Sequence, residues 1–225
     1  MQSHIMKRYL SLALLAVLAA CSSPTTETTD TLPILGRRYY DEATRDTVYH
    51  TVGDFSFVNQ DSALVTPATL DGKIYVADFF FTSCPTICPI MKKEMLRVYD
   101  EFKNNPEVVI VSHTIDPEYD TVALLHDYAE RLGVASPSWQ FVTGEKDSIF
   151  NIALKSYMVT AAEEEQAPGG RIHSGAFILV DKQRRIRGMY DGTVSEQVDV
   201  LINDIHRLLR EEKQPAVSLL AFPAR

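Results

Sequence analysis

Two long apolar runs in the middle of the chain predict buried strands. Residues 74–81 read IYVADFFF, and residues 108–115 read VVIVSHTI. Runs that are rich in β-branched and aromatic residues are typical of strands covered on both faces. The pattern therefore predicts two central strands of one sheet, and a shorter strand is expected around residues 140–142.

Apolar residues recur at helical spacing between and after these strands. Four segments show this spacing, at about residues 90–102, 120–132, 145–157 and 198–209. Asp120 is expected to cap the second of these helices, and Gly133 is expected to end it. The first part of the folded chain is therefore predicted to alternate between strands and helices.

The last third of the chain predicts a different order. Ala176–Val180 and Ile186–Tyr190 flank the polar stretch DKQR, which is the pattern of a two-stranded antiparallel hairpin. The stretch AAEEEQAPGG at residues 161–170 is expected to be an acidic, mobile loop with a Gly-Gly hinge. The order βαβ followed by ββα is that of the thioredoxin fold, and residues 55–65 are expected to add an amino-terminal hairpin or strand. We therefore predict an α/β protein with a thioredoxin-like fold, in which helices flank a central mixed sheet.

The amino terminus has the layout of an export signal. Two basic residues precede an apolar run at residues 10–20, which ends in Leu-Ala-Ala-Cys. Eleven residues span only about 16 Å as a helix, whereas a bilayer core is about 30 Å thick, so a signal peptide is predicted rather than a membrane span. The ending resembles the bacterial lipoprotein box, which implies that residues 1–20 are removed and that Cys21 is acylated. The polar segment 22–31 is expected to be a solvated tether, and the protein is expected to be extracytoplasmic, anchored to a membrane and facing the periplasm or the cell exterior.

Composition narrows the class of partner. The 225 residues include 22 Lys and Arg against 30 Asp and Glu, which gives a formal net charge of −8. This balance provides no basic surface for phosphate backbones, so nucleic-acid binding is not expected. Three cysteines are too few for a disulfide-rich scaffold or a four-thiolate zinc site.

Cys84 and Cys88 lie where a predicted buried strand ends and a helix begins. Backbone N–H groups and the helix dipole favour a thiolate at such a position, and a lowered pKa makes a cysteine a better metal ligand and a better nucleophile. The i, i+4 spacing places both sulfurs on one face of the first helical turn. The pair could therefore form a disulfide or share one metal ion, and Pro85 and Pro89 stiffen the turn.

Two thiolates alone make an incomplete site for a tightly held metal ion, so a histidine is the candidate third ligand. His173 follows the Gly169-Gly170 hinge and precedes the expected strand at residues 176–180. A loop could therefore carry His173 over the cysteines. His113, near the carboxyl end of a central strand, is either a core residue or a group close to the site. Surface or hydrogen-bonded positions are expected for His50, His126 and His206.

Four segments of the chain are similar to the Sco/SenC family. The run FFFTSCPTICP at residues 79–89 resembles the family's copper motif, F-x-x-x-C-P-x-x-C-P with one further residue between the cysteines. The others are IDPEYDT at residues 115–121, IHS at residues 172–174 and YDG at residues 190–192. The resemblance spans about residues 46–209. It implies a membrane-tethered copper chaperone, binding Cu(I) or Cu(II), that helps to metallate the binuclear copper site of cytochrome c oxidase subunit 2.

The resemblance also assigns residues. The family's copper ligands fall on Cys84, Cys88 and His173, and its aspartates near the site fall on Asp116 and Asp120. The family's histidine is often preceded by Asp, whereas this chain has Ile172, so electrostatic tuning from that position is missing. Soft thiolates suit Cu(I), which accepts two or three ligands, whereas structural Zn(II) normally takes four. Swinging His173 away would leave a weaker two-ligand site, against which a recipient could compete.

These inferences divide the chain into four parts. They are a signal peptide at residues 1–20, a lipid-anchored cysteine and linker at 21–45, a copper-binding domain at 46–213 and a tail at 214–225.

A thiol–disulfide oxidoreductase with the same fold is the main alternative, with Cys84 attacking and Cys88 resolving. Three residues separate the cysteines, where enzymes of the thioredoxin type usually have two, and His173 stands where those enzymes have a proline. A copper-linked redox sensor is a further alternative. It would use the same residues to report on copper or redox state rather than to deliver copper. The disulfide form cannot hold copper, so a thiol reductant is expected as a partner.

Overall fold

The computed structural model describes residues 31–164 and 171–213. The fold described here belongs to the unit that begins at Thr31. Several predictions lie outside the described residues: the signal peptide, Cys21, the Gly169-Gly170 hinge and the tail at residues 214–225.

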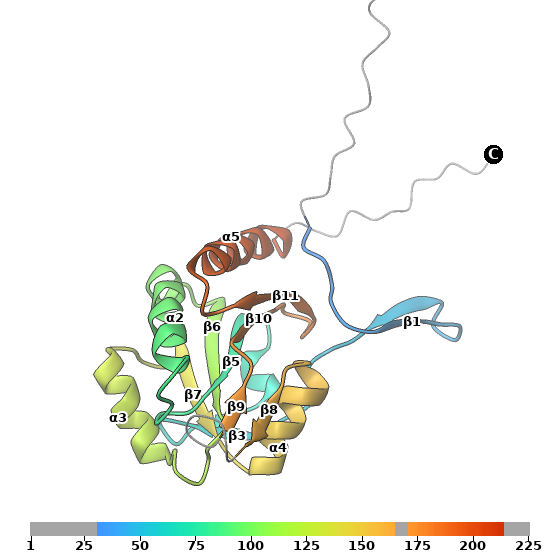
Figure 1. Cartoon of the computed structure of the whole chain (residues 1–225). Coiled ribbons are helices and arrows are strands. Elements are labelled where there is room, and N and C mark those ends of the chain that lie inside the picture. Colours follow the sequence, from blue (N-terminus) through green and yellow to red (C-terminus); the bar gives the residue numbers. More distant parts are fainter. Residues whose placement is uncertain (1–30, 165–170, 214–225) are drawn as a thin grey trace, which may run out of the picture. The chain divides into compact units, whose positions relative to one another are not determined.

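Three parallel strands form the centre of a seven-stranded sheet with the order β11-β10-β5-β6-β7-β3-β4 (Figure 1). Every residue of β5 (Ile74–Phe80), β6 (Val108–Thr114) and β7 (Trp139–Thr143) is buried. Parallel pairing in register along β5 and β6 brings their carboxyl ends side by side. The two apolar runs therefore form central strands, as predicted.

Antiparallel strands flank this centre on both sides, so the sheet is mixed. β10 (Ala176–Val180) pairs with β5, and β11 (Ile186–Asp191) pairs with β10. On the other side, β3 (Phe57–Asn59) pairs with β7 and with β4 (Leu64–Val65), which supplies the expected amino-terminal hairpin. A short 3-10 helix at Pro67–Leu70 leads into β5.

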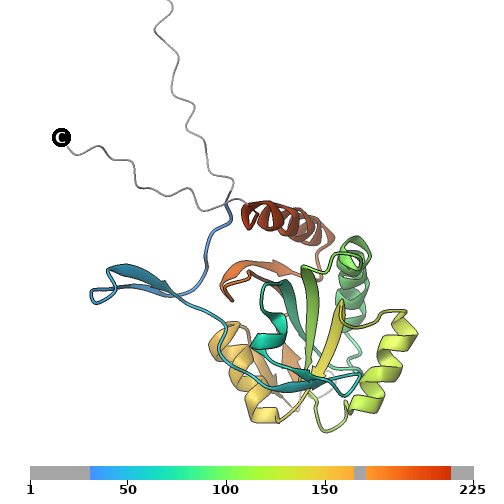
Figure 2. The same ribbon diagram turned by 180° about the vertical axis from the view of Figure 1, so that it is seen from behind.

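Helices cover both faces of the sheet (Figures 1 and 2). α2 (Cys88–Phe102) and α3 (Val122–Leu132) lie on one face, and α4 (Lys146–Asn151) lies on the other. α5 (Ser195–Glu211) contacts α2, β5 and β11. α2 and α3 share a face because they connect parallel strands, β5 to β6 and β6 to β7, in the same direction across the sheet, and crossovers of one hand place both helices on one side. Within the described residues, no helix has the length and apolar content that crossing a membrane requires.

The structure differs from the sequence prediction at two helices. Thr121, rather than Asp120, caps α3, because the Thr121 hydroxyl accepts a hydrogen bond from the Leu124 backbone N–H at 3.3 Å. The helix predicted over residues 145–157 is divided, since α4 ends at Asn151 and a π-helical turn follows at Ile152–Ser156.

Two small hairpins lie outside the main sheet. One pairs β1 (Arg38–Asp41) with β2 (Asp46–Tyr49), and the other pairs β8 (Ala161–Glu163) with β9 (Arg171–His173). β8 corrects the expectation of a loop over residues 161–170, because the first three of these residues pair as a strand. Regular structure also begins within the segment predicted as linker, since β1 precedes residue 46.

Candidate metal centre

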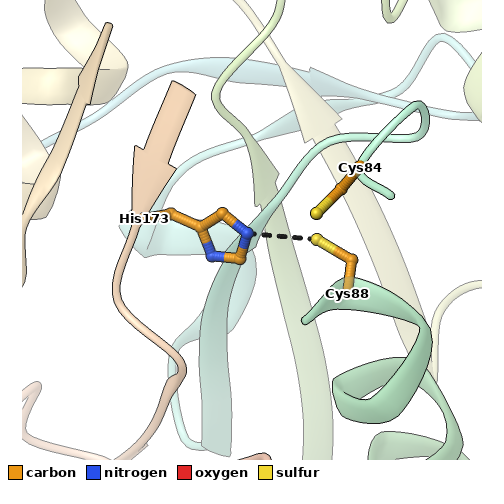
Figure 3. A group of neighbouring side chains, drawn as sticks. All are labelled: Cys84, Cys88 and His173. Atoms are coloured by element: carbon orange, nitrogen blue, oxygen red, sulfur yellow. Dashed lines mark hydrogen bonds between the residues drawn. The ribbon is translucent and has the colours of Figure 1, made fainter. Parts of the chain in front are cut away.

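Three elements bring Cys84, Cys88 and His173 together beyond the carboxyl end of β5 (Figure 3). The turn after β5 carries Cys84, and Cys88 is the first residue of α2. His173 is the last residue of β9 and comes 85 positions after Cys88 in the chain. The fold thus assembles the three residues that the sequence singled out as ligands.

The side chains offer their ligand atoms at distances suited to one ion. Both Sγ atoms and a ring nitrogen of His173 all lie within 4.8 Å of one another. Cys88 Sγ lies 3.1 Å from His173 Nε2, which is a hydrogen bond between a thiol and an imidazole. The exposed fractions of Cys84, Cys88 and His173 are only 9%, 6% and 7%, so an ion held there would be largely shielded from water.

The two thiols differ in acidity. Burial raises the pKa of Cys84, but hydrogen bonds from the Thr86 and Cys88 backbones and side chains outweigh burial, so the pKa falls below its usual value. Burial raises the pKa of Cys88 far above its usual value, and the neighbouring Cys84 raises it further. Cys84 is therefore the thiol that ionises first. A bound cation would supply the positive charge that allows Cys88 to ionise as well.

The imidazole of His173 presents Nε2 to the cysteines. Its Nδ1 lies 3.1 Å from the Ser174 carbonyl oxygen, so the Nδ1–H group donates to that carbonyl and Nε2 carries the lone pair. Burial lowers the pKa of His173, which favours the neutral ring that a metal ion requires. The Phe81 ring meets the imidazole in a T-shaped contact with centroids 5.9 Å apart.

The donor set favours a soft ion. Two thiolates and one imidazole match the preferences of copper, and Cu(I) accepts three such ligands. Structural zinc usually takes four protein ligands, but no fourth Cys, His, Asp or Glu joins this group among the described residues. The centre therefore fits copper better than structural zinc.

His113 lies in the core and is not one of the grouped ligand residues. It is fully buried on β6, in contact with the rings of Phe55, Phe57, Phe79 and Tyr157. Of the two alternatives left by the sequence, the core position is the one that the structure shows.

The remaining histidines of the described chain occupy surface or hydrogen-bonded positions. His126 and His206 are exposed and lie next to carboxylates. The partly buried His50 is hydrogen-bonded through Nε2 to the Ser156 carbonyl oxygen at 2.7 Å. None of the three is part of the metal-ligand group.

Asp116 and Asp120 lie in the turn between β6 and α3. Asp120 is fully buried and accepts hydrogen bonds from Thr82 and Thr114, so it contacts the turn that carries Cys84. The backbone of Asp116 shapes the turn between β6 and α3, because the Asp116 carbonyl oxygen accepts a hydrogen bond from the Asp120 N–H at 2.8 Å. Neither carboxylate belongs to the group of ligand atoms.

A buried carboxyl group next to Cys88, that of Asp78, was not predicted from the sequence. Asp78 on β5 lines a cavity of about 10 Å³ together with Cys88 and Lys92. Burial raises the pKa of Asp78 to about 7, although a hydrogen bond from the Ser112 hydroxyl opposes this effect. The sequence did contain a sign of this group, since Asp78 is the only acidic residue in the apolar run IYVADFFF. A carboxyl group buried there needs hydrogen-bond partners, because a buried carboxylate without them is costly.

Solved structures of known proteins share the fold. BsSco, described as a member of the Sco family of cytochrome c oxidase assembly proteins with a disulfide switch, is 32% identical, with a TM-score of 0.62 over 71% of this chain and 93% of that one. Arabidopsis thaliana ScoI, solved with copper bound, is 28% identical, with a TM-score of 0.60 over 72% of this chain and 99% of that one.

Sequence comparisons lead to the same family. The SCO1 protein homolog of Bacillus subtilis is 33% identical over 163 residues, which cover 72% of this chain and 84% of that protein. A SCO1/SenC family lipoprotein from Bacillus anthracis is 28% identical, with a TM-score of 0.65 over 71% of this chain and 95% of that one. The model of the SCO1/SenC family matches residues 43–210. This protein therefore belongs to the SCO1/SenC family.

Proposed function

We propose that this protein is a membrane-tethered copper chaperone that delivers copper to the binuclear copper site of cytochrome c oxidase subunit 2, or reduces the cysteines of that site. The convergence of Cys84, Cys88 and His173 carries the proposal, because two soft sulfurs and one imidazole nitrogen can hold copper. The copper-bound Arabidopsis ScoI supports the choice of metal. The family of BsSco, whose members are oxidase assembly proteins, supports the process.

Delivery would proceed by ligand exchange. Two ligands come from the junction of β5 and α2, and the third comes from the separate β8–β9 hairpin, where His173 pairs with Ala161. The Ser174 N–H group also donates to the Thr160 carbonyl oxygen at 2.9 Å, so His173 moves together with this hairpin. Displacement of the hairpin would withdraw Nε2 and leave two thiolates, a weaker site against which the recipient can compete.

The anchor and the reductant belong to the same proposal. Removal of residues 1–20 and acylation of Cys21 would hold the protein outside the cytoplasm, facing the periplasm or the cell exterior. A disulfide between Cys84 and Cys88 would remove both thiolate ligands. A dithiol reductant, itself oxidised to a disulfide, would return the pair to the free form in which the structure has it.

Copper titration tests the metal centre. Full-length protein in detergent is titrated with Cu(I) against a competing chelator, and with Cu(II) while the sulfur-to-copper charge-transfer absorption is recorded. We expect Cys84→Ser and Cys88→Ser to abolish binding, and His173→Ala to weaken it by orders of magnitude, because each variant removes one of three ligands. The control is His126→Ala, which removes an exposed imidazole and should bind copper as the wild type does. Unchanged affinity in His173→Ala would contradict the three-ligand site.

A thiol–disulfide oxidoreductase is the second candidate, and the unequal thiols favour it. Cys84, with the lowered pKa, is suited to attack, and Cys88, with the raised pKa, is suited to resolve the mixed disulfide. This function would be supported if the wild-type protein exchanges disulfides with unfolded substrates and does not bind copper. Exchange of this kind needs no metal ion, so a copper chelator should then leave the exchange rate unchanged.

A further inference from the structure

The turn that carries Cys84 is attached to the rest of the protein through Thr82. The Thr82 backbone N–H donates to Asp120 Oδ2 at 3.1 Å, and the Thr82 hydroxyl donates to Asp120 Oδ1 in a very short contact. A second backbone hydrogen bond at this turn joins the Cys84 N–H to the Phe81 carbonyl oxygen at 3.2 Å. Both carboxylate oxygens of Asp120 thus accept hydrogen bonds from Thr82, which lies two positions before Cys84.

Asp120 is built into the protein rather than placed on its surface. Its exposed fraction is 0%, and a third donor, the Thr114 hydroxyl, lies 2.5 Å from Oδ2. A buried carboxylate is costly unless hydrogen bonds replace its lost water, and three donors meet this requirement. Because Thr114 ends β6 and Thr82 follows β5, Asp120 joins the ends of the two central strands.

The turn held by Asp120 is shared by two metal-ligand residues. Thr82 begins it, Cys84 lies within it, and Cys88 at its far end starts α2. A shift of Thr82 would therefore move Cys84 Sγ relative to Cys88 Sγ, whose own position depends on the helix. His173 comes from another hairpin and would not follow this shift.

We propose that Asp120 is a positioning residue of the metal centre, which fixes Thr82 so that Cys84 Sγ is held at the right distance from Cys88 and His173. Asp120 acts through Thr82 and contacts no ligand atom itself. The inference deepens the proposed copper function and identifies the part of the scaffold that sets the geometry of the thiol pair.

Asp120→Asn is the principal test, because it keeps the volume of the side chain and replaces one accepting oxygen by a donor. Full-length protein in detergent is titrated with Cu(I) against a chelator, and the charge-transfer band is recorded with Cu(II). We expect a roughly 10- to 100-fold loss of Cu(I) affinity and a shifted band, as is typical when a group that orients a ligand is removed. An affinity within about twofold of the wild type, with an unshifted band in a folded variant, would overturn the proposal.

Variants at Thr82 keep the test decisive if Asp120→Asn does not fold. Thr82→Ser retains both donors to Asp120, whereas Thr82→Val retains only the backbone N–H. We expect Thr82→Ser to bind Cu(I) as the wild type does and Thr82→Val to bind it more weakly. Equal affinities in the two variants would overturn the positioning role.

Thr114→Val is the control, because it removes a donor to Asp120 and the acceptor of the Asp116 N–H but leaves both hydrogen bonds from Thr82 to Asp120 in place. We expect Thr114→Val to unfold at a lower temperature yet to bind Cu(I) within about threefold of the wild type. A loss of affinity as large as that of Asp120→Asn would assign Asp120 a role in stability alone.

Metal-free measurements separate this inference from the proposed function. The reduction potential of the Cys84–Cys88 pair and the alkylation rate of Cys84 are measured for the wild type and for Asp120→Asn without copper. We expect both to change in Asp120→Asn, even if the wild type binds no copper and the chaperone function fails. Values that match the wild type would overturn the positioning role.

Discussion

Asp78 and His113 are buried ionisable residues on neighbouring central strands, and burial acts on them in opposite directions. Burial raises the pKa of Asp78 to about 7, against a hydrogen bond from Ser112. Burial lowers the pKa of His113 to about 4, against hydrogen bonds to the backbones of Asp78 and Val111. Both groups are therefore held in their neutral forms over the range in which unfolded chains would ionise them.

These two shifts predict opposite pH dependences of stability. The native state binds the Asp78 proton more tightly than the unfolded chain does, so Asp78 stabilises the fold at low pH. This contribution, roughly 4 kcal/mol, is lost as the pH rises from about 4 to about 7. The unfolded chain binds the His113 proton more tightly, so His113 makes the free energy of unfolding rise by roughly 3 kcal/mol between about pH 4 and pH 6.5. In the wild type the two slopes largely cancel.

Single substitutions should expose each slope. We expect the free energy of unfolding of Asp78→Asn to rise with pH between 4 and 6.5, and that of His113→Phe to fall between pH 4 and 7. Urea unfolding at a series of pH values, with a thiol reductant and a copper chelator present, measures both. Curves that run parallel to the wild-type curve would show that neither group titrates as described.

At the scale of elements, the junction of β11 and α5 depends on a close approach of backbone to ring. A Cβ atom added at Gly192 would lie 2.5 Å from the Phe177 ring on β10, which is closer than real contacts allow. The Gly192 N–H also donates to the Gly175 carbonyl oxygen at 2.7 Å, so the backbone has little room to move away. Glycine at this position is therefore a packing requirement.

Gly192→Ala should destabilise the fold by about 1–3 kcal/mol, since the added methyl group forces the Phe177 ring or the β11–α5 turn to shift. Thermal or urea unfolding of the metal-free protein measures the loss. The matched control is Gly175→Ala on the other side of the same hydrogen bond, where an added Cβ would meet its nearest atom at 3.5 Å. Equal stabilities of the two variants would contradict this account.

At the scale of the whole molecule, a buried arginine joins the two ends of the described chain. Arg187 on β11 has a side chain that is 2% exposed, and it donates to the Leu32 and Pro33 carbonyl oxygens at 2.5 and 3.0 Å. Its guanidinium also bonds to Asp181 at 3.1 Å and to Glu211 at 2.6 Å, near the end of α5. The segment at Leu32 is therefore packed against the domain.

This junction lies away from the metal centre. The register places Val180 opposite both Tyr75 and Ile186, so Arg187 lies near the amino end of β5. The cysteines follow the carboxyl end of β5, and a seven-residue strand separates the two regions by roughly 20 Å. Changes at Arg187 should therefore alter stability without altering the copper site.

Arg187→Met should destabilise the fold by about 3–5 kcal/mol, because it leaves buried Asp181 and the carbonyl groups of Leu32 and Pro33 without this donor. Amide hydrogen exchange should also quicken at Leu32 and Leu35. In the wild type, the Leu32 N–H donates to the Glu211 carboxylate and the Leu35 N–H donates to the Ile186 carbonyl oxygen. The control is Arg184→Met, whose ion pair with Asp54 is exposed and worth about 0–1 kcal/mol. Exchange at Leu32 that stays as slow as in the wild type would contradict the role of Arg187.

The sequence by itself determined the elements whose causes are local or periodic. Apolar runs predicted β5 and β6, because a strand covered on both faces needs nearly every side chain to be apolar. Helical spacing predicted α2, and the motif around Cys84 and Cys88 located the chemistry at the start of that helix. His173 was predicted from its place in the sequence and from its match to the family.

Only the tertiary structure decided which distant groups meet. Asp120 was expected to cap a helix and, from the resemblance, to lie near the site. Its partner Thr82, 38 positions away, and the actual cap Thr121 came only from the structure. Arg187 meets Leu32 across 155 positions, a contact that the sequence did not indicate. Such contacts leave no periodic trace in the chain, because they depend on how complete strands and helices pack, whereas the elements themselves follow from the polarity of neighbouring residues.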